Sequence, residues 1–240
     1  MNISVFFVIL FSVLCVFIIY LITDSRKMSI HESRARTFNF LAIGDSLTAG
    51  YYNYGRAFHP YSTLLGSLLD TINVHALIDE KGVSGELVVP TMANRLANIL
   101  NTSVNYDWVI ILGGTNDLAG TITAEKLFNE GLKPMYEMCL NYSKRKLKLA
   151  AMTVIQNAFY APSHVQDQTR QQLNNLIRNY VATSPYQDRI VLVDLDRGIP
   201  YHSMTSDEER KLVWDDGLHL TPTGYDRMAV LIFDTIKNKL

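Results

Sequence analysis

Short apolar runs alternate with segments of helical periodicity from Phe38 to the C-terminus. Runs of about four to eight mostly apolar residues, bounded by glycine or polar turns, are typical of strands buried on both faces of a sheet. Five runs predict such strands: Phe40–Ile43, Val74–Ile78, Trp108–Leu112, Leu147–Val154 and Ile190–Val193. Strands that alternate with helices favour an α/β fold with a parallel sheet covered on both faces.

Between these runs, apolar residues recur at the spacing of a helical face. The periodicity predicts helices in the segments 61–69, 88–99, 124–141, 163–183 and 221–236. Gly131 and Pro134 interrupt the third segment, so we expect a break there, with Pro134 in the first turn of a new helix. Thr221 and Pro222 are typical of a helix start, with Thr as the N-cap and Pro at the first helical position.

Residues 3–22 form a continuous apolar run without charge, proline or glycine. A helix of this length spans about 30 Å, the thickness of a bilayer core. We therefore expect a membrane anchor at 1–23, a polar linker at 24–37 and one domain at 38–240. A cleaved signal peptide followed by secretion is the alternative, although no basic residue precedes the run and Thr23-Asp24-Ser25 is a poor cleavage site.

The residues that flank the apolar run do not decide on which side of the membrane the domain lies. Its nearest basic residues, among them Arg26 and Lys27, follow it, and the positive-inside rule then places the domain in the cytoplasm. Asn101 and Asn141 begin glycosylation acceptor triplets, which matter only in a secretory lumen.

Composition narrows the function classes. The 240 residues are 48% hydrophobic and carry a formal net charge of −1, so one domain with a sizeable core is expected and nucleic acid is not a predicted partner. The only cysteines are Cys15 and Cys139, and Cys15 lies in the apolar run, so no disulfide framework is predicted. The sequence shows no pattern of metal ligands.

Four polar motifs follow predicted strands or precede a predicted helix. They are GDSLTAG at 44–50, GVSGE at 82–86, GGTND at 113–117 and DGLHLTPTGY at 216–225. Ligands of parallel α/β sheets bind at the carboxyl ends of the strands, so the motifs are expected to share one edge.

The residue types in these motifs are those of nucleophilic catalysis. Ser46 lies just past a strand end, and Asp216 lies three residues before His219. A catalytic histidine must accept a proton at one ring nitrogen while an anion holds the other. Each motif alone also fits a turn, a helix cap or a structural histidine, but four such motifs together favour a catalytic site.

The four blocks, in this order, resemble the signature blocks of the SGNH/GDSL hydrolase family. The resemblance implies a flavodoxin-like, three-layer α/β/α sandwich with a five-stranded parallel sheet. It implies Ser46 as the nucleophile, with Asp216 and His219 completing the triad. Gly85 and Asn116 would join the Ser46 backbone N–H in the oxyanion hole. No metal or organic cofactor is implied.

Other side chains compete for these roles. His59, His164 and His202 lack the Asp-x-x-His pattern, and Asp215 has the wrong spacing to His219. Glu86 stands where Asp is frequent in the family.

The predicted function is hydrolysis of a small-molecule or lipid-like carboxylic ester through an acyl-enzyme. Acyl transfer or carbohydrate deacetylation on the same residues is the alternative, because triad and fold do not choose among them. A non-catalytic, membrane-anchored binding module would show a damaged triad, and this one is intact. The oligomeric state is left open.

Aromatic residues at two places on the same edge fit either an apolar substrate pocket or surface packing: Tyr51, Tyr52, Tyr54, Phe58, Phe159 and Tyr160.

Overall fold

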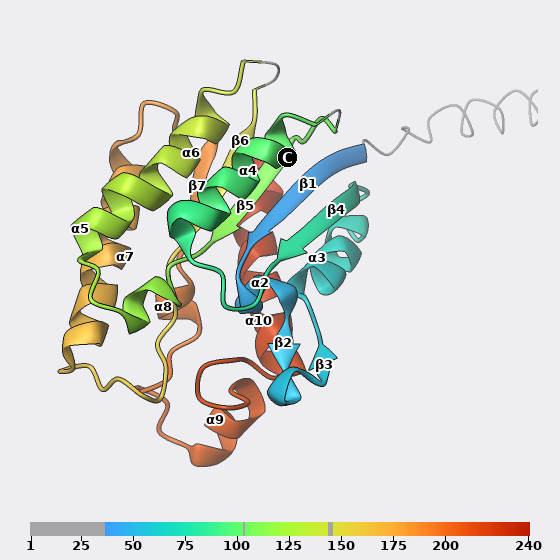
Figure 1. The fold of residues 1–240 in the computed structure, drawn as a ribbon. Coiled ribbons are helices and arrows are strands. Elements are labelled where there is room, and N and C mark those ends of the chain that lie inside the picture. The colour runs from blue at the N-terminus through green and yellow to red at the C-terminus, as the bar shows by residue number, and fades with distance from the viewer. Residues whose placement is uncertain (1–36, 103, 144–145) are drawn as a thin grey trace, which may run out of the picture. The chain divides into compact units, whose positions relative to one another are not determined.

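A parallel sheet of five strands, in the order β4-β1-β5-β6-β7, lies at the centre of the fold (Figure 1). The computed structural model describes residues 37–102, 104–143 and 146–240. The strands are β1 (Thr37–Gly44), β4 (His75–Gly82), β5 (Trp108–Leu112), β6 (Lys148–Met152) and β7 (Ile190–Val193). The predicted five-stranded parallel sheet is confirmed. Strand β4 continues past its predicted run because it is an edge strand, which tolerates polar residues on its exposed side.

Helices cover both faces of this sheet, which makes three layers. Figure 1 shows α4 and α6 on one side of the strands and α10 on the other. The helices are α2 (Ser46–Ala49), α3 (Tyr61–Asp70), α4 (Ala93–Leu100), α5 (Ala124–Leu127), α6 (Lys133–Leu140), α7 (Val165–Thr183), α8 (Leu195–Gly198), α9 (Asp207–Val213) and α10 (Pro222–Ile236). A small hairpin, β2 (Tyr51–Tyr52) with β3 (Ala57–Phe58), completes the fold.

Strand β5 shows how the sequence fills both layers. Successive side chains of a strand point to opposite faces of the sheet. Trp108, Ile110 and Leu112 enter the core beneath α3 and α10, whereas Val109 and Ile111 enter the core beneath α4 to α7. All five side chains are buried, which explains why this run contains no polar position.

The predicted interruption near Gly131 and Pro134 is present, but the chain stays helical through it. One π-helical turn, Phe128–Leu132, joins α5 to α6, and Pro134 lies in the first turn of α6. Because proline has no backbone N–H, the regular series of α-helical hydrogen bonds is interrupted at Pro134.

The predicted anchor at 1–23 lies outside the described residues, as does the predicted linker except for Thr37, where β1 begins. Among the described residues, no helix is long and apolar enough to cross a membrane. The anchor therefore stays a prediction, which alkaline extraction of the membrane fraction would test.

Candidate active site

Ser46 occupies the first position of α2, and only Asp45 separates it from the end of β1. The Asp45 side chain accepts a hydrogen bond from the Leu47 N–H at 3.0 Å and caps this short helix. Asp45 is fully buried, and Ser46 is 5% exposed. The helix-capping alternative for this motif is therefore correct for Asp45, while Ser46 keeps its hydroxyl for another contact.

The loop before α10 holds a carboxylate and an imidazole together. One oxygen of Asp216 accepts hydrogen bonds from the backbone N–H groups of Leu218 at 3.0 Å and His219 at 2.8 Å. The other, Oδ2, lies 2.8 Å from His219 Nδ1. Gly217 makes the turn with φ of 84°, in the left-handed region that favours glycine. The backbone thus presents the Asp216 carboxylate to the imidazole.

The imidazole of His219 reaches the serine from the opposite end of the chain. His219 Nε2 lies 3.0 Å from Ser46 Oγ, although 173 residues separate them in sequence. The structure therefore brings the three predicted triad residues into one continuous line of hydrogen bonds. The ring of Tyr51 packs against the imidazole, with 4.3 Å between ring centroids.

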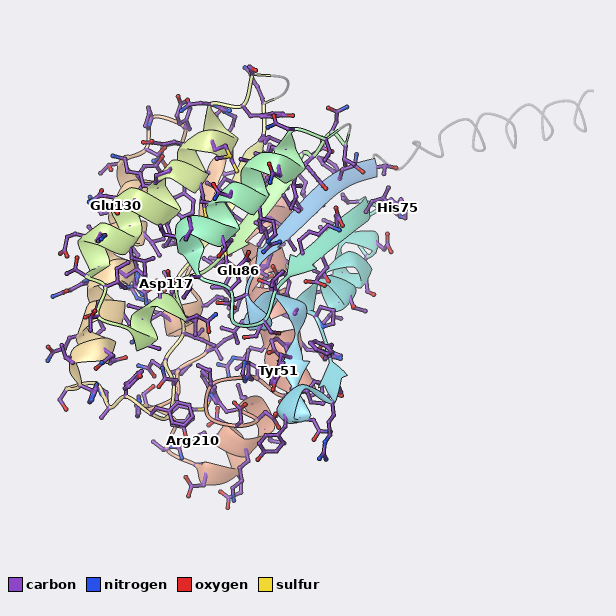
Figure 2. All side chains as sticks on the ribbon, in the orientation of Figure 1. Tyr51, His75, Glu86, Asp117, Glu130 and Arg210 are labelled. Carbon is purple, nitrogen blue, oxygen red and sulfur yellow. The ribbon has the colours of Figure 1, made fainter. Side chains whose placement is uncertain are left out.

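The two further residues of the predicted oxyanion hole follow neighbouring strands. Gly44, at the end of β1, pairs in register with Gly82 of β4 and with Leu112 of β5. The loops that carry Ser46, Gly85 and Asn116 therefore leave adjacent strand ends. In Figure 2, Tyr51, Glu86 and Asp117, which lie in or beside these loops, are labelled around this end of the sheet.

Backbone and amide donors remain open at this edge. Within the described residues, no hydrogen bond is found for the backbone N–H of Ser46 or Gly85. Asn116 donates one amide N–H to the Glu86 carbonyl at 3.0 Å, which leaves its second N–H. Gly85 has φ of 78°, and an added Cβ would meet no atom within 4 Å, so its surroundings are open. These three donors therefore have no hydrogen-bond acceptor in the part of the chain that the structure describes.

A family model described as the GDSL-like lipase/acylhydrolase family matches residues 42–227. The chain belongs to this family. The match covers all four motifs and strands β4, β5, β6 and β7. No curated protein is similar enough to the chain to be matched.

Solved structures of several esterases share the fold of this family member. The native aryl esterase of M. smegmatis is 20% identical with a TM-score of 0.62, over 85% of this chain and 100% of its own. A family 3 carbohydrate esterase of Clostridium thermocellum is 23% identical with a TM-score of 0.61, over 85% and 96%. A carbohydrate acetylesterase family member from Sinorhizobium meliloti is 17% identical with a TM-score of 0.65, over 85% and 99%.

Two carboxylates beside the GDSL serine have opposite pKa shifts. Burial would raise the pKa of Asp216, but the hydrogen bonds from the His219 N–H and imidazole and from the Leu218 N–H lower it below its usual value. Burial raises the pKa of Asp45 to about 7; the Leu47 N–H opposes the shift, and the nearby carboxylates of Asp117 and Glu86 add to it. Asp216 is therefore an anion over a wide pH range, as an orienting acid requires.

The rejected candidates have other partners. His59 Nε2 lies 2.8 Å from Asp226, and His202 Nε2 lies 2.9 Å from two backbone carbonyl oxygens. His164 accepts the Gln166 N–H at 3.4 Å and caps α7. Asp215 accepts the Asn53 N–H at 2.7 Å and so holds the loop between β2 and β3. In the part of the chain that the structure describes, no group of three acidic, histidine or cysteine side chains could hold a metal ion.

The aromatic residues on this edge divide into two groups. Tyr51 contacts the imidazole, whereas Tyr54, Phe58 and Phe159 are largely exposed. Sequence reasoning placed Tyr51 at the site but missed its contact with His219; its position next to the GDSLTAG block is the only signal for it. A hollow of about 430 Å³ lies beside Asp216, lined by residues of the 158, 201 and 207–217 segments.

Proposed function

We propose that this GDSL family member is a carboxylic ester hydrolase whose catalytic triad is Ser46, His219 and Asp216. The observation that supports this most directly is the line of hydrogen bonds from Ser46 Oγ through both ring nitrogens of His219 to Asp216 Oδ2. The same three residue types in the same contacts serve nucleophilic hydrolases on unrelated folds.

In this mechanism the proton of the Ser46 hydroxyl passes to His219 Nε2 as Oγ attacks the carbonyl carbon of the ester. Nδ1–H of His219 donates to Asp216, which fixes the tautomer and stabilises the imidazolium that forms. His219 then protonates the leaving alcohol, and a water molecule attacks the acyl-enzyme by the same route. Water releases the acid and restores the Ser46 hydroxyl.

The carbonyl oxygen becomes negatively charged in each tetrahedral intermediate. The N–H groups of Ser46 and Gly85 and the free amide N–H of Asn116 are the donors that we assign to it. Fixed donors of this kind lower the barrier because they need no reorganisation when the charge appears, and one donor contributes about 3 kcal/mol.

Two observations bear on the acyl and alcohol groups of the substrate. Tyr51 and the exposed aromatic residues near it support an ester with an apolar part, as in a small aryl or lipid-like ester. The names of two structural neighbours, a carbohydrate esterase and an acetylesterase, make acetylated sugars the second class to test.

Replacement of the nucleophile tests the proposal. Ser46→Ala should lower the hydrolysis of a short nitrophenyl ester by a factor on the order of 10⁴ to 10⁶, because no other residue replaces the attacking oxygen. A fluorophosphonate probe should label Ser46 in the wild-type protein and leave Ser46→Ala unlabelled. Ser67→Ala, an exposed serine of α3, is the matched control and should keep full activity. Undiminished hydrolysis by folded Ser46→Ala would refute the assignment.

A further inference from the structure

Arg95 and Glu86 form an ion pair next to Gly85, and the carboxylate of Glu86 is buried. Arg95, in α4, donates from Nε to one carboxylate oxygen of Glu86 at 2.9 Å and from Nη2 to the other. The Glu86 side chain is only 7% exposed, so its charge has little contact with water. A two-pronged contact of this kind fixes direction as well as distance.

The same guanidinium also holds the ends of two strands. Arg95 Nη1 donates to the Lys81 carbonyl at 2.8 Å, near the end of β4. Its Nη2 donates to the Gly44 carbonyl at 3.1 Å, at the end of β1 and two residues before Ser46. One side chain therefore joins the nucleophile turn to the strand that leads into the Gly85 loop.

The loop is fixed on its other side to the segment that carries Asn116. The Glu86 carbonyl accepts the Asn116 amide N–H at 3.0 Å, and the Val88 N–H donates to Asp117 at 3.0 Å. Figure 2 shows Glu86 and Asp117 at the same end of the sheet. All three segments that supply open donors thus meet at the Arg95–Glu86 pair.

We propose that Arg95 is a positioning residue: through Glu86 it holds the Gly85 N–H and the Asn116 amide at a fixed geometry relative to Ser46. This inference rests on the proposed function, because it assigns those donors to the oxyanion. Lysine cannot replace arginine in this position, since a single ammonium group lacks the planar fork that reaches the carboxylate and two carbonyls together. A donor displaced by about 1 Å loses much of its effect on the transition state.

The test compares Arg95→Lys with Arg178→Lys in the full-length protein. Arg178 forms a similar double contact with Asp194, but at the far half of the sheet edge. We expect Arg95→Lys to lower kcat for a nitrophenyl ester at least tenfold with KM within twofold of wild type. Arg178→Lys should lower the unfolding midpoint in urea and keep kcat within twofold. The second variant is Glu86→Gln, which we expect to lower kcat at least fivefold. It tests the same ion pair if Arg95→Lys does not fold.

A double-mutant cycle separates positioning from general destabilisation. In the Asn116→Ala background, Arg95→Lys should lower kcat by a smaller factor than in the wild-type background, because one of the two donors that it positions is already gone. Unchanged kcat in folded Arg95→Lys or Glu86→Gln, or an equal loss in both backgrounds, would overturn the inference alone. A wild-type protein that neither hydrolyses esters nor is labelled at Ser46 would overturn the proposed function and this inference together.

Discussion

Arginine side chains contact loops in both halves of the sheet's carboxyl edge. One half lies at the ends of β1, β4 and β5 and carries the proposed nucleophile (the nucleophile half). The other lies at the ends of β6 and β7 (the scaffold half). In the nucleophile half, Arg95 contacts Glu86 and two backbone carbonyls. In the scaffold half, Arg178 contacts Asp194 and Asp196, and Arg170 contacts Asp167 and the Val154 carbonyl. Both halves therefore use buried or half-buried charge to fix loops.

The two halves differ in how their asparagine side chains are paired. Asn174, fully buried in the scaffold half, accepts the Val154 N–H and donates to the Val154 carbonyl, both at 2.8 Å. Asn116 in the nucleophile half pairs only its amide nitrogen, through one N–H, and among the described residues the backbone N–H groups of Ser46 and Gly85 have no hydrogen-bond partner. Gly85 is exposed and Asn116 is half-buried, so a ligand that enters beside the serine and the imidazole can pair with these donors.

The largest test of this difference replaces one aspartate in each half. Asp216→Asn should lower kcat by about 10⁴-fold, because an amide no longer holds the imidazole in the required tautomer. Asp194→Asn should leave kcat unchanged and reduce the free energy of unfolding by about 2 kcal/mol, since Arg178 loses a charged partner. Ester hydrolysis and urea unfolding measure the two quantities.

If Asp194→Asn, while folded, lost activity as strongly as Asp216→Asn, the scaffold half would not be separate from the reaction centre. Equal unfolding curves for wild type and Asp194→Asn would instead show that the Arg178 pair contributes little to stability, as exposed pairs do.

The asparagines give the next smaller effect. Asn116→Ala should lower kcat by about 10²- to 10³-fold, the usual effect of one missing oxyanion donor. Asn174→Ala should keep kcat and cost about 2 to 4 kcal/mol of stability, because two buried backbone groups lose their partners. A kcat for Asn116→Ala within threefold of wild type would remove the Asn116 amide from the oxyanion hole.

Sequence patterns predicted the parts of the fold that are set by residues close together in the sequence. The run Trp108–Leu112 coincides with β5 because every side chain in it is buried, and Thr221 caps α10 as its type suggests. The hairpin of β2 and β3 was missed, because strands of two residues are too short for any periodicity to appear.

The site shows the same division between local and distant contacts. Ser46, Asp216 and His219 stand in motifs that a sequence displays directly. Arg95 was not predicted, because in sequence it is only a charged residue on an amphipathic helix, and its partners at Gly44 and Lys81 become neighbours only when the sheet forms.

The smallest predicted effect concerns pH. The pKa of Asp45 in the nucleophile half is raised, whereas the pKa of Asp194 in the scaffold half is lowered. Burial raises the pKa of Asp45 to about 7, above its unfolded value, so ionised Asp45 destabilises the fold and its contribution falls as pH rises from about 4 to 7. Burial favours a higher pKa for Asp194 too, but Arg178 lowers it below the usual value; its contribution is present above about pH 4 and is lost as pH falls.

Asp45→Asn should therefore remove the decline in stability between pH 4 and 7, because the amide keeps an oxygen for the Leu47 N–H and never ionises. Asp194→Asn should leave that interval unchanged and flatten the acid limb below about pH 4. Urea unfolding of both variants and wild type across pH 3 to 8 measures the two slopes. A decline of wild-type size in Asp45→Asn would mean that Asp45 already ionises near pH 4 in the fold. The carboxyl group next to the nucleophile would then be paired with a cation or with water, and the contrast between the two halves would rest on their open donors alone.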